Sequence, residues 1–228
     1  MDGASGPTAL YELTDVAHAY ESGRQPALRN IRLTIMPGEF VALAGPSGSG
    51  KTTLLNLLAM IERPQAGELR FEDRPVTGFD EQELTRIRRG RLGYLLQTLN
   101  LIPVLTAYEN VEYFLLRAPM SAASRRERVR GALAATGVAE LADRRPSEMS
   151  GGQRQRVALA RILAREVPVV LADEPTAALD RETALSVIGL MKSLHRERGV
   201  TFIFSSHDPD ILAAAGRVIT LRDGRILP

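Results

Sequence analysis

The most informative stretch of the chain is residues 45–53, which read Gly45-Pro46-Ser47-Gly48-Ser49-Gly50-Lys51-Thr52-Thr53. It matches G-x-x-x-x-G-K-[ST], the pattern of a phosphate-binding P-loop. Before it, Phe40–Ala44 is an apolar run typical of a buried parallel strand, and after it residues 54–59 favour a helix. Strand, turn and helix together direct backbone N–H groups and the positive end of a helix dipole to one point, which suits a polyphosphate. We therefore expect Lys51 to reach the β- and γ-phosphates of a nucleoside triphosphate and the Thr52 hydroxyl to bind Mg²⁺.

The composition is that of a globular protein with a sizeable core. Hydrophobic residues make up 44% of the 228 residues and charged residues 25%, which fits one large domain or a domain with an inserted lobe. Because the sequence has no cysteine, disulfides, thiolate metal sites and thiol redox chemistry are excluded. The first residues lack the pattern of a signal peptide, and no apolar run has the length of a transmembrane helix. We expect a cytoplasmic protein that another chain must anchor if it works at a membrane.

Arginine dominates the basic residues and occurs in clusters. The formal net charge is only +2, yet the isoelectric point is about 9.2. Such clusters can attract nucleic acid or anionic lipid headgroups. No aromatic residues are interleaved to stack on bases, so we favour solvated helix faces and expect no specific nucleic-acid partner. The clusters are Arg86, Arg88, Arg89 and Arg91; Arg125, Arg126, Arg128 and Arg130; and Arg144 with Arg145.

Hydrophobic periodicity divides the rest of the chain into strands and helices. The expected strands are residues 11–20, Leu28–Ile35, a hairpin at 67–71 and 74–76, residues 92–96, 167–172 and 200–205, and a terminal hairpin at 218–221 and 225–227. The expected helices are residues 80–89 with an Asp80 and Glu83 capping box, a helix through Ala164 with a Ser150 and Gln153 capping box, Arg181–Arg198 with Asp180 as its cap, and a short helix from Pro209 that Gly216 ends. Residues 1–8 are expected to form a disordered tail.

Residues 98–149 differ from the rest, because no strand pattern interrupts two helical segments there. The expected capping boxes are Thr106 with Glu109 and Ser124 with Glu127, and Gly137 is placed to end the second helix. The fold class that follows is α/β. We expect a P-loop NTPase core with an antiparallel β subdomain and an inserted helical subdomain at about residues 98–149, within a single domain of residues 1–228.

An acidic pair, Asp173-Glu174, follows the buried strand expected at residues 167–172. Ligands of open parallel sheets bind at the carboxyl ends of the strands, so both acids would face the phosphates held by the P-loop. We expect Asp173 to hold Mg²⁺ opposite Thr52, and Glu174 to be the general base that orients and deprotonates the attacking water. An acidic pair after a strand can also be only a helix cap, but the P-loop earlier in the chain favours the catalytic interpretation.

A second glycine-containing helix start reads Ser150-Gly151-Gly152-Gln153. Its glycines let backbone N–H groups approach a phosphate closely, and Ser150 can donate its hydroxyl. A capped helix without a ligand is the alternative. Together with the P-loop and the acidic strand end, this string makes the chain resemble the ATP-binding subunit of an ABC transporter, whose signature sequence is S-G-G-Q. The resemblance covers about residues 10–227.

The resemblance implies roles for four further residues. Tyr20 corresponds to the aromatic residue that stacks on adenine, and Gln97 to the glutamine that touches Mg²⁺ and the attacking water. Asp180 ends a stretch similar to the loop that lies across the dimer interface, and His207 corresponds to the switch histidine at the γ-phosphate. The catalytic residues would be Glu174, His207, Gln97 and Lys51, and the Mg²⁺ ligands Thr52, Gln97 and Asp173. The ATP contacts would be Tyr20, Gly45, Pro46, Ser47, Gly48, Ser49, Gly50, Lys51, Thr52, Thr53, Ser150, Gly151, Gly152, Gln153 and Asp180.

The resemblance also implies a function. Within the family, residues 99–111 are similar to the branch of lipoprotein-releasing, macrolide-exporting and cell-division ATPases. The implied protein is a homodimer that hydrolyses ATP with Mg²⁺ at the inner face of the cell membrane and drives a separately encoded membrane permease. An ATP-switched regulator of a cell-wall enzyme, acting through a membrane partner, shares every motif and stays open. A soluble ABC-type ATPase acting on nucleic acid is disfavoured, because the sequence has neither a long coiled-coil insertion nor a second ATPase half.

Overall fold

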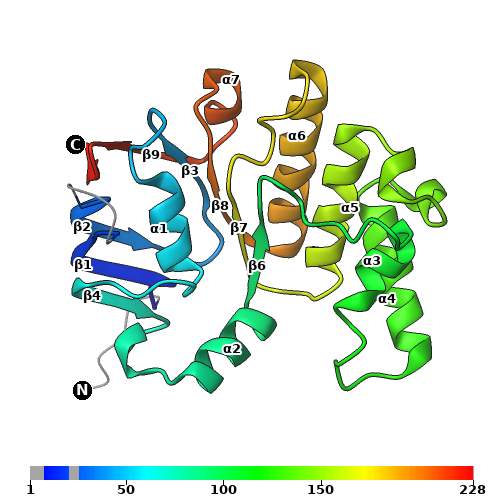
Figure 1. Ribbon diagram of the computed structural model, residues 1–228, viewed down its shortest axis with the longest axis horizontal. Coiled ribbons are helices and arrows are strands. Elements are labelled where there is room, and N and C mark those ends of the chain that lie inside the picture. The colour runs from blue at the N-terminus through cyan, green and yellow to red at the C-terminus, as the bar shows by residue number, and fades with distance from the viewer. Residues whose placement is uncertain (1–7, 21–25, 228) are drawn as a thin grey trace.

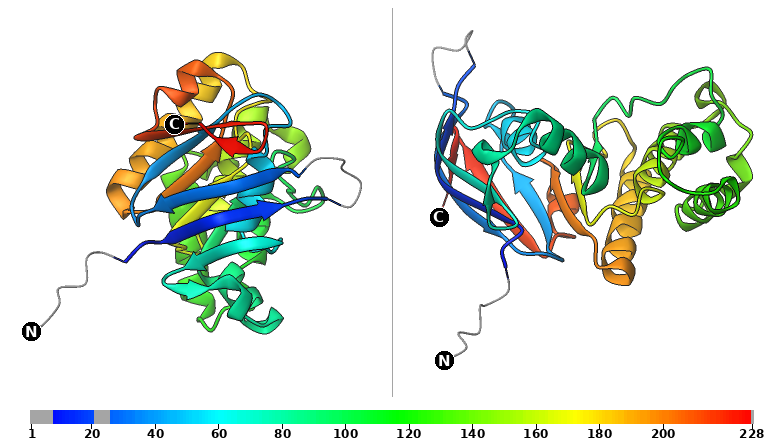
Figure 2. Two further views of the ribbon diagram at one scale, coloured as in Figure 1. Left: turned by 90° about the vertical axis from the view of Figure 1, so that its left-hand side faces the viewer. Right: turned by 90° about the horizontal axis from the view of Figure 1, so that it is seen from below.

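The computed structural model describes residues 8–20 and 26–227 of the chain. These residues form an antiparallel sheet, a largely parallel sheet and a set of helices. Figure 2 shows the antiparallel sheet at one end of the molecule, the parallel sheet in the middle and a group of helices at the other end. The arrangement is the expected α/β core with a β subdomain and a helical subdomain. The tail expected at residues 1–8 lies outside the described residues except for Thr8.

The antiparallel sheet has four strands in the order β2-β1-β4-β5. They are β1 (Tyr11–His18), β2 (Leu28–Ile35), β4 (Ala66–Phe71) and β5 (Arg74–Pro75). Along β2, residues Leu28, Ile31, Leu33 and Ile35 are buried and most residues between them are not, as a half-buried strand requires. The strands and the first hairpin expected in this part of the chain are therefore confirmed.

The second sheet has six strands in the order β10-β9-β3-β8-β7-β6. They are β3 (Phe40–Ala44), β6 (Leu92–Leu95), β7 (Val169–Ala172), β8 (Thr201–Ser205), β9 (Arg217–Arg222) and β10 (Arg225–Ile226). All neighbours run parallel except β9 and β10, which form the terminal hairpin. Val41 and Leu43 of β3 belong to one hydrophobic core, while Phe40 and Ala42 belong to the other. Because both faces of the sheet are covered, its central strands read as continuous apolar runs.

Seven α-helices occur within the described residues. They are α1 (Lys51–Leu58), α2 (Glu81–Gly90), α3 (Ala107–Tyr113), α4 (Ala122–Ala135), α5 (Gly151–Leu163), α6 (Arg181–Arg198) and α7 (Pro209–Leu212), with short 3-10 turns at Val76–Gly78, Ala139–Leu141 and Pro146–Glu148. Helix α1 lies between the two sheets, α5 and α6 cover the other face of the parallel sheet, and α3 and α4 pack on α5 (Figure 1). None of the helices in residues 8–20 and 26–227 is both long and apolar enough to cross a membrane.

Two helix boundaries expected from the sequence are wrong. Ser121 rather than Ser124 caps α4, because the Ser121 Oγ accepts a hydrogen bond of 3.1 Å from the backbone N–H of Ser124. Helix α7 ends before Gly216, whose N–H donates to the carbonyl oxygen of Phe40 at 2.9 Å on the way into β9. The capping boxes expected for α2, α3 and α5 are confirmed, as is the end of α4 at Gly137, which has a φ of +67°.

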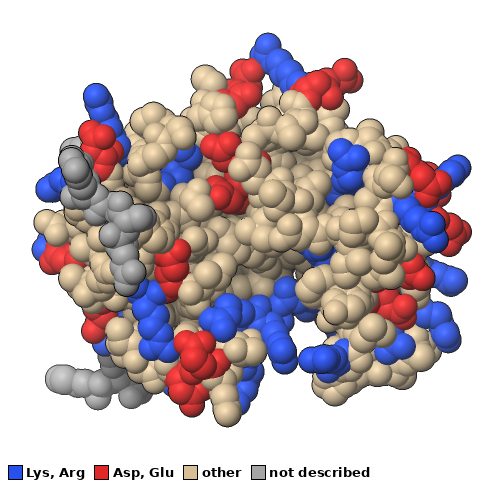
Figure 3. Space-filling view, in the orientation of Figure 1, with Lys and Arg blue, Asp and Glu red and all other residues tan. Residues whose placement is uncertain are grey.

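Several arginines of the helical end pair with carboxylates. Arg125 pairs with Glu112 at 2.9 Å, and Arg128 pairs with Glu166 at 2.8 Å. In Figure 3, acidic and basic side chains alternate over the helical end, while basic groups gather around a hollow in the lower half of this face. The charge of the helical end is therefore mixed, as on a solvated helix surface.

Candidate nucleotide-binding and catalytic site

The P-loop joins β3 to α1 and runs close to other strands. Gly45, Gly48 and Gly50 have positive φ angles of 142°, 76° and 105°. A Cβ on Gly45 would overlap the carbonyl oxygen of Leu221 in β9, and one on Gly50 would lie 2.6 Å from the carbonyl oxygen of Ala27. The loop therefore follows a path that a residue with a side chain could not take at either position.

The beginning of α1 is suited to an anion. Its N-cap residue, Gly50, gives no side-chain hydrogen bond to the helix, so no side chain occupies the positive end of the helix dipole. Lys51 is only 6% exposed, and its Nζ donates to the carbonyl oxygens of Gly45 and Pro46 at 2.8 and 3.0 Å. The buried Ser49 hydroxyl has no hydrogen-bond partner within the described residues. An unpartnered hydroxyl, a lysine ammonium group and an uncapped helix start fit a phosphate.

A chain of hydrogen bonds connects the P-loop to the acidic end of β7. The Thr52 hydroxyl donates to Asp173 Oδ2 at 2.8 Å, and the Ser205 hydroxyl donates to Asp173 Oδ1 at 2.7 Å. Ser205 Oγ also accepts the backbone N–H of Glu174 at 2.7 Å. These contacts exist because β8 lies between β3 and β7 in the sheet, so the carboxyl ends of all three strands meet at one edge.

Thr52 and Asp173 could hold Mg²⁺ between them. A hydroxyl and a carboxylate are hard oxygen ligands of the kind that Mg²⁺ prefers, with the remaining places filled by phosphates and water. The described part of the chain contains no cluster of three or more histidine, aspartate or glutamate side chains able to hold a metal ion. The hydroxyl of Thr52 and the carboxylate of Asp173 fit a Mg²⁺ ion that phosphates and water also bind.

Glu174 and His207 face each other at the same edge of the sheet. The Nδ1 of His207 lies 3.5 Å from Glu174 Oε1. Glu174 has a left-handed backbone with a φ of 43°, and its side chain is 25% exposed. Both residues line a depression of about 200 Å³ together with Ser206 and Asp208. A partly exposed carboxylate beside an imidazole can orient and deprotonate a water molecule.

Tyr20 lies beside the P-loop helix, and 42% of the residue is exposed. Its hydroxyl donates to Glu62 at 2.9 Å and lies 3.4 Å from the Thr53 hydroxyl. Glu62 also accepts from the side-chain amide of Asn56 at 3.0 Å and lies 2.9 Å from His18 Nε2. Tyr20 is therefore held in place by its hydroxyl, and its ring contacts the His18 ring edge-to-face with the centroids 5.1 Å apart.

Gln97 follows β6 at the same edge but is exposed. Leu95 at the end of β6 is in register with Ala172, and its carbonyl oxygen accepts the N–H of Asp173 at 3.0 Å. Gln97 thus follows Leu95, the residue that bonds Asp173, by two positions. In the part of the chain that the structure describes, its side chain makes no hydrogen bond to Asp173 or Glu174.

The second predicted phosphate site begins α5 on the helical side. Ser150 Oγ accepts the N–H of Gln153 at 3.3 Å, and the Gln153 side chain accepts the N–H of Ser150 at 2.8 Å. Asp180 caps α6 by accepting the N–H of Thr183 at 3.0 Å, and hydrogen bonds from Thr183 hold the pKa of Asp180 below its usual value. A Cβ on Gly152 would overlap the Thr183 side chain, so the beginnings of α5 and α6 are packed together. Among the described residues, no hydrogen bond joins residues 150–153 to residues 45–53.

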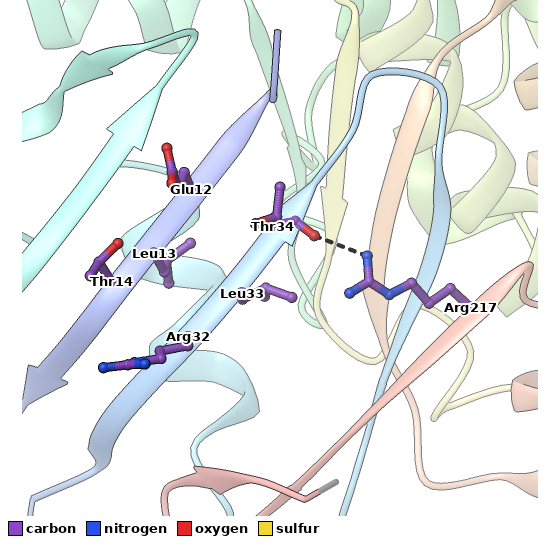
Figure 4. A pocket seen from close by; sticks show the side chains of 7 residues that line it. All are labelled: Glu12, Leu13, Thr14, Arg32, Leu33, Thr34 and Arg217. Carbon is purple, nitrogen blue, oxygen red and sulfur yellow. Dashed lines mark hydrogen bonds between the residues drawn. The ribbon is translucent and has the colours of Figure 1, made fainter. Parts of the chain in front are cut away.

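A larger depression of about 510 Å³ lies away from these residues, on β1, β2 and the Arg217 side chain (Figure 4). Arg217 donates to the carbonyl oxygen of Thr34 at 2.9 Å and pairs with Glu39 at 3.1 Å. Arg32, also at its edge, pairs with Asp15 at 2.7 Å. None of the site residues expected from the sequence lines it, so size alone does not mark the functional site.

Comparison with known proteins decides the family. The family model described as ABC transporter matches residues 28–177. The chain belongs to the ABC transporter family. An uncharacterized ABC transporter ATP-binding protein of Methanocaldococcus jannaschii, MJ0796, is 42% identical over 223 residues, which cover 95% of this chain and 95% of that protein. The macrolide export ATP-binding/permease protein MacB of Marinobacter nauticus is 44% identical over 97% of this chain, which spans only 34% of that protein.

Solved structures give the same result for this ABC transporter chain. A dimeric structure of MJ0796, in a post-hydrolysis state bound to ADP and phosphate, superposes with a TM-score of 0.86 at 41% identity. The match covers 96% of this chain and 97% of that chain. The ABC ATPase fold predicted from the sequence is therefore confirmed.

The ABC transporter chain also has supporting residues that sequence reasoning missed. Ser205 forms hydrogen bonds with both Asp173 and Glu174. Glu62 contacts the side chains of Tyr20, Asn56 and His18. Ser205 could have been noticed, because a polar residue directly follows the apolar run Phe202-Ile203-Phe204 at the end of a predicted strand. Nothing near Glu62 in the sequence indicates its partners at residues 18 and 20.

Proposed function

We propose that this chain is the ATP-hydrolysing subunit of an ABC transporter and that it drives a separate membrane-embedded permease. The observation that carries the proposal is the hydrogen bond between Thr52 and Asp173, which joins the P-loop to the acidic strand end at one point. The MJ0796 structure bound to ADP and phosphate supports the same reaction, since that cassette matches nearly the whole chain.

In the proposed reaction, the P-loop amides and Lys51 bind the phosphates of ATP. Lys51 exchanges its two carbonyl partners for phosphate oxygens, because an ammonium group bonds more strongly to an anion. Bound Mg²⁺ would neutralise the charge that develops on the phosphates and would be held by Thr52 and Asp173, with Gln97 near it. Tyr20 stacks on the adenine ring.

Glu174 then accepts the proton of the attacking water, and His207 contacts the γ-phosphate from the adjacent position. The 3.5 Å separation of Glu174 and His207 allows both to reach one water-phosphate pair. Attack in line with the leaving ADP oxygen gives ADP and inorganic phosphate. The P-loop amides and Lys51 stabilise the transition state, because they are already oriented before reaction.

Residues 150–153 and Asp180 complete the site in a homodimer of this chain. The Ser150 side chain is exposed and its hydroxyl proton is not needed for the capping box, so it can donate to the γ-phosphate bound by a second copy. A second solved structure of MJ0796 is also dimeric and superposes on this chain with a TM-score of 0.87, which supports this arrangement. ATP would then favour the closed dimer, and release of phosphate would open it.

We propose that the membrane partner resembles the permease part of MacB-like proteins and that the subunit works at the inner face of the membrane. The MacB relatives support this, since their names join ATP-binding and permease functions and this chain covers only about a third of their length. An ATP-switched regulator of a membrane-linked cell-wall enzyme would use the same reaction with a different partner.

The Glu174→Gln variant tests the proposal. It keeps the size and hydrogen-bonding reach of the side chain but removes the base, so hydrolysis should fall roughly 100-fold or more while ATP still binds. In sedimentation, the variant should be a dimer with ATP and a monomer with ADP, and adding Ser150→Arg should return it to monomer. The control is Glu166→Gln, because Glu166 also has a left-handed backbone, with a φ of 53°, but pairs with Arg128 away from the site. A Glu174→Gln variant that still hydrolyses ATP, or that holds ATP as a monomer, contradicts the proposal.

A further inference from the structure

Helix α5 packs tightly on β6, the edge strand that leads to Gln97. A Cβ on Gly93 in β6 would overlap the Ile162 side chain of α5 and lie 3.2 Å from Val167. Strand and helix are therefore in direct contact at the middle of β6. The C-terminal turn of α5, and not its first turn, makes this contact.

Arg161 of α5 binds the segment that follows β6. Its side chain is buried, with 7% of the residue exposed, and donates to the carbonyl oxygens of Leu99 and Asn100 at 2.7 Å each. The centroid of the Phe114 ring lies 5.1 Å from the guanidinium carbon. Burial lowers the pKa of Arg161, and the charge of Arg165 lowers it further. A buried arginine with two carbonyl acceptors and an aromatic cover is a fixed anchor and not a solvated surface charge.

The segment that Arg161 binds has a backbone that needs support. Leu99 and Asn100 both have left-handed φ angles, of 57° and 47°. Leucine rarely adopts this conformation, and two such residues in succession persist only where surrounding contacts hold them. The two Arg161 hydrogen bonds go to the carbonyl groups of these same two residues.

Arg165 provides a matched anchor on the other side of β6. One helical turn after Arg161, its guanidinium donates to the carbonyl oxygen of Arg88 at 2.8 Å and also to that of Arg89, at the end of α2. The two arginines thus bind the segments before and after β6. Only the segment after β6 carries a residue proposed to act at the nucleotide.

We propose that Arg161 is a positioning residue, which holds residues 97–100 against α5 so that Gln97 keeps a fixed place relative to the helix that begins at Ser150. The proposal rests on the proposed ATPase function, in which Gln97 acts at the γ-phosphate bound by its own chain and residues 150–153 act at the γ-phosphate bound by a second copy. Helix α5 is a rigid connection of about 15 Å from Gly151 to Arg161. If α5 shifts when Ser150 binds a phosphate, the segment that carries Gln97 therefore moves with it.

The test compares Arg161→Met with Arg165→Met in hydrogen exchange and steady-state ATPase assays. Arg161→Met should speed exchange of the Leu99 and Asn100 amides, which donate to Leu96 and Thr98, while α5 itself stays protected. The kcat for ATP should fall roughly 10- to 100-fold with KM changed less than about threefold, because Gln97 is misplaced and the phosphate contacts remain. Arg161→Lys, which keeps the charge and can reach one carbonyl, should recover part of the kcat.

Arg165→Met is the control, since it removes a similar anchor from the same part of the chain. It should speed exchange at the end of α2 and leave kcat within about threefold of the wild type, because the released segment bears no site residue. Equal losses of kcat in both variants would overturn the proposal, as would faster exchange at residues 99 and 100 with an unchanged kcat. A wild-type chain without ATPase activity would instead contradict the proposed function, and the exchange data would still decide whether Arg161 holds the segment.

Discussion

The beginnings of α1 and α5 are both glycine-containing and both predicted to bind phosphate, yet they are built differently. Helix α1 begins at Gly50, which has a left-handed backbone and no side-chain cap. Helix α5 begins at Ser150, whose hydroxyl forms a reciprocal capping box with Gln153. The first start leaves its helix donors for a ligand, whereas the second already satisfies one of them internally. We therefore expect α1 to hold an anion on its own and α5 to add contacts to an anion held elsewhere.

The surroundings of the two helix starts also differ, because the start of α1 is enclosed by its own chain and the start of α5 is exposed. Lys51 is buried and its neighbour Thr52 bonds Asp173, so the α1 site is assembled within one chain. Ser150 is exposed, and the residues that pack against the glycines after it, Thr183 and Leu179, support the backbone from one side. A partner that brings its own bound nucleotide could therefore approach Ser150 from solvent.

The largest effect is expected for Lys51→Met on the α1 side. The variant loses a charged hydrogen-bond donor to the phosphates, so ATP affinity should fall about 100-fold. Titration calorimetry with Mg-ATP measures this affinity. Lys192→Met is the matched control, because Lys192 donates to the carbonyl oxygen of Ala214 on the other side of the sheet. If both variants bind ATP equally well, α1 is not the primary phosphate site.

A smaller and different effect is expected for Ser150→Ala on the α5 side. ATP affinity of the monomer should stay within about twofold, while loss of the cap destabilises the protein by about 1 kcal/mol. Hydrolysis should fall about tenfold, because one donor to the shared phosphate is lost. The readouts are urea unfolding and an ATPase assay.

Ser121→Ala separates the two consequences of losing Ser150. It removes an equivalent cap from α4, so the free energy of unfolding should fall similarly without a fall in ATPase activity. Equal activity in the two variants would mean that Ser150 only caps its helix.

The smallest effect concerns Asp180, which caps the helix packed beside Gly152. Hydrogen bonds from Thr183 hold the pKa of Asp180 below its ordinary value, so the ionised form is stabilised in the folded protein. This contribution is present above the ordinary pKa of about 4 and is lost as pH falls through the lower folded value. Asp180→Asn keeps a side chain that can cap α6 but removes the charge. The free energy of unfolding of the variant should therefore be slightly lower than that of the wild type at pH 7 and equal to it near pH 2. Urea unfolding at several pH values measures the difference, and a difference that grows as pH falls would contradict this assignment.

The sequence alone determined the parts of this protein that depend on neighbours along the chain. Apolar runs and capping boxes placed nearly all strands and helices, because these signals come from residues within one helical turn or one strand. The P-loop, the acidic pair and the S-G-G-Q string indicated the site for the same reason. The capping error at Ser124 arose because Ser121, three residues earlier, is an equally good cap.

Only the tertiary structure decided which distant residues support the site. The strand order β3-β8-β7-β6 brings Ser205 onto Asp173 and puts Leu95, two residues before Gln97, in register with Ala172, and no local pattern encodes that order. Likewise, Arg161 reads from the sequence as one more helix arginine, and only packing of α5 on β6 buries it against Leu99 and Asn100. Periodicity reports which face of an element is buried, but the partner of a buried polar group depends on how the elements are arranged in space.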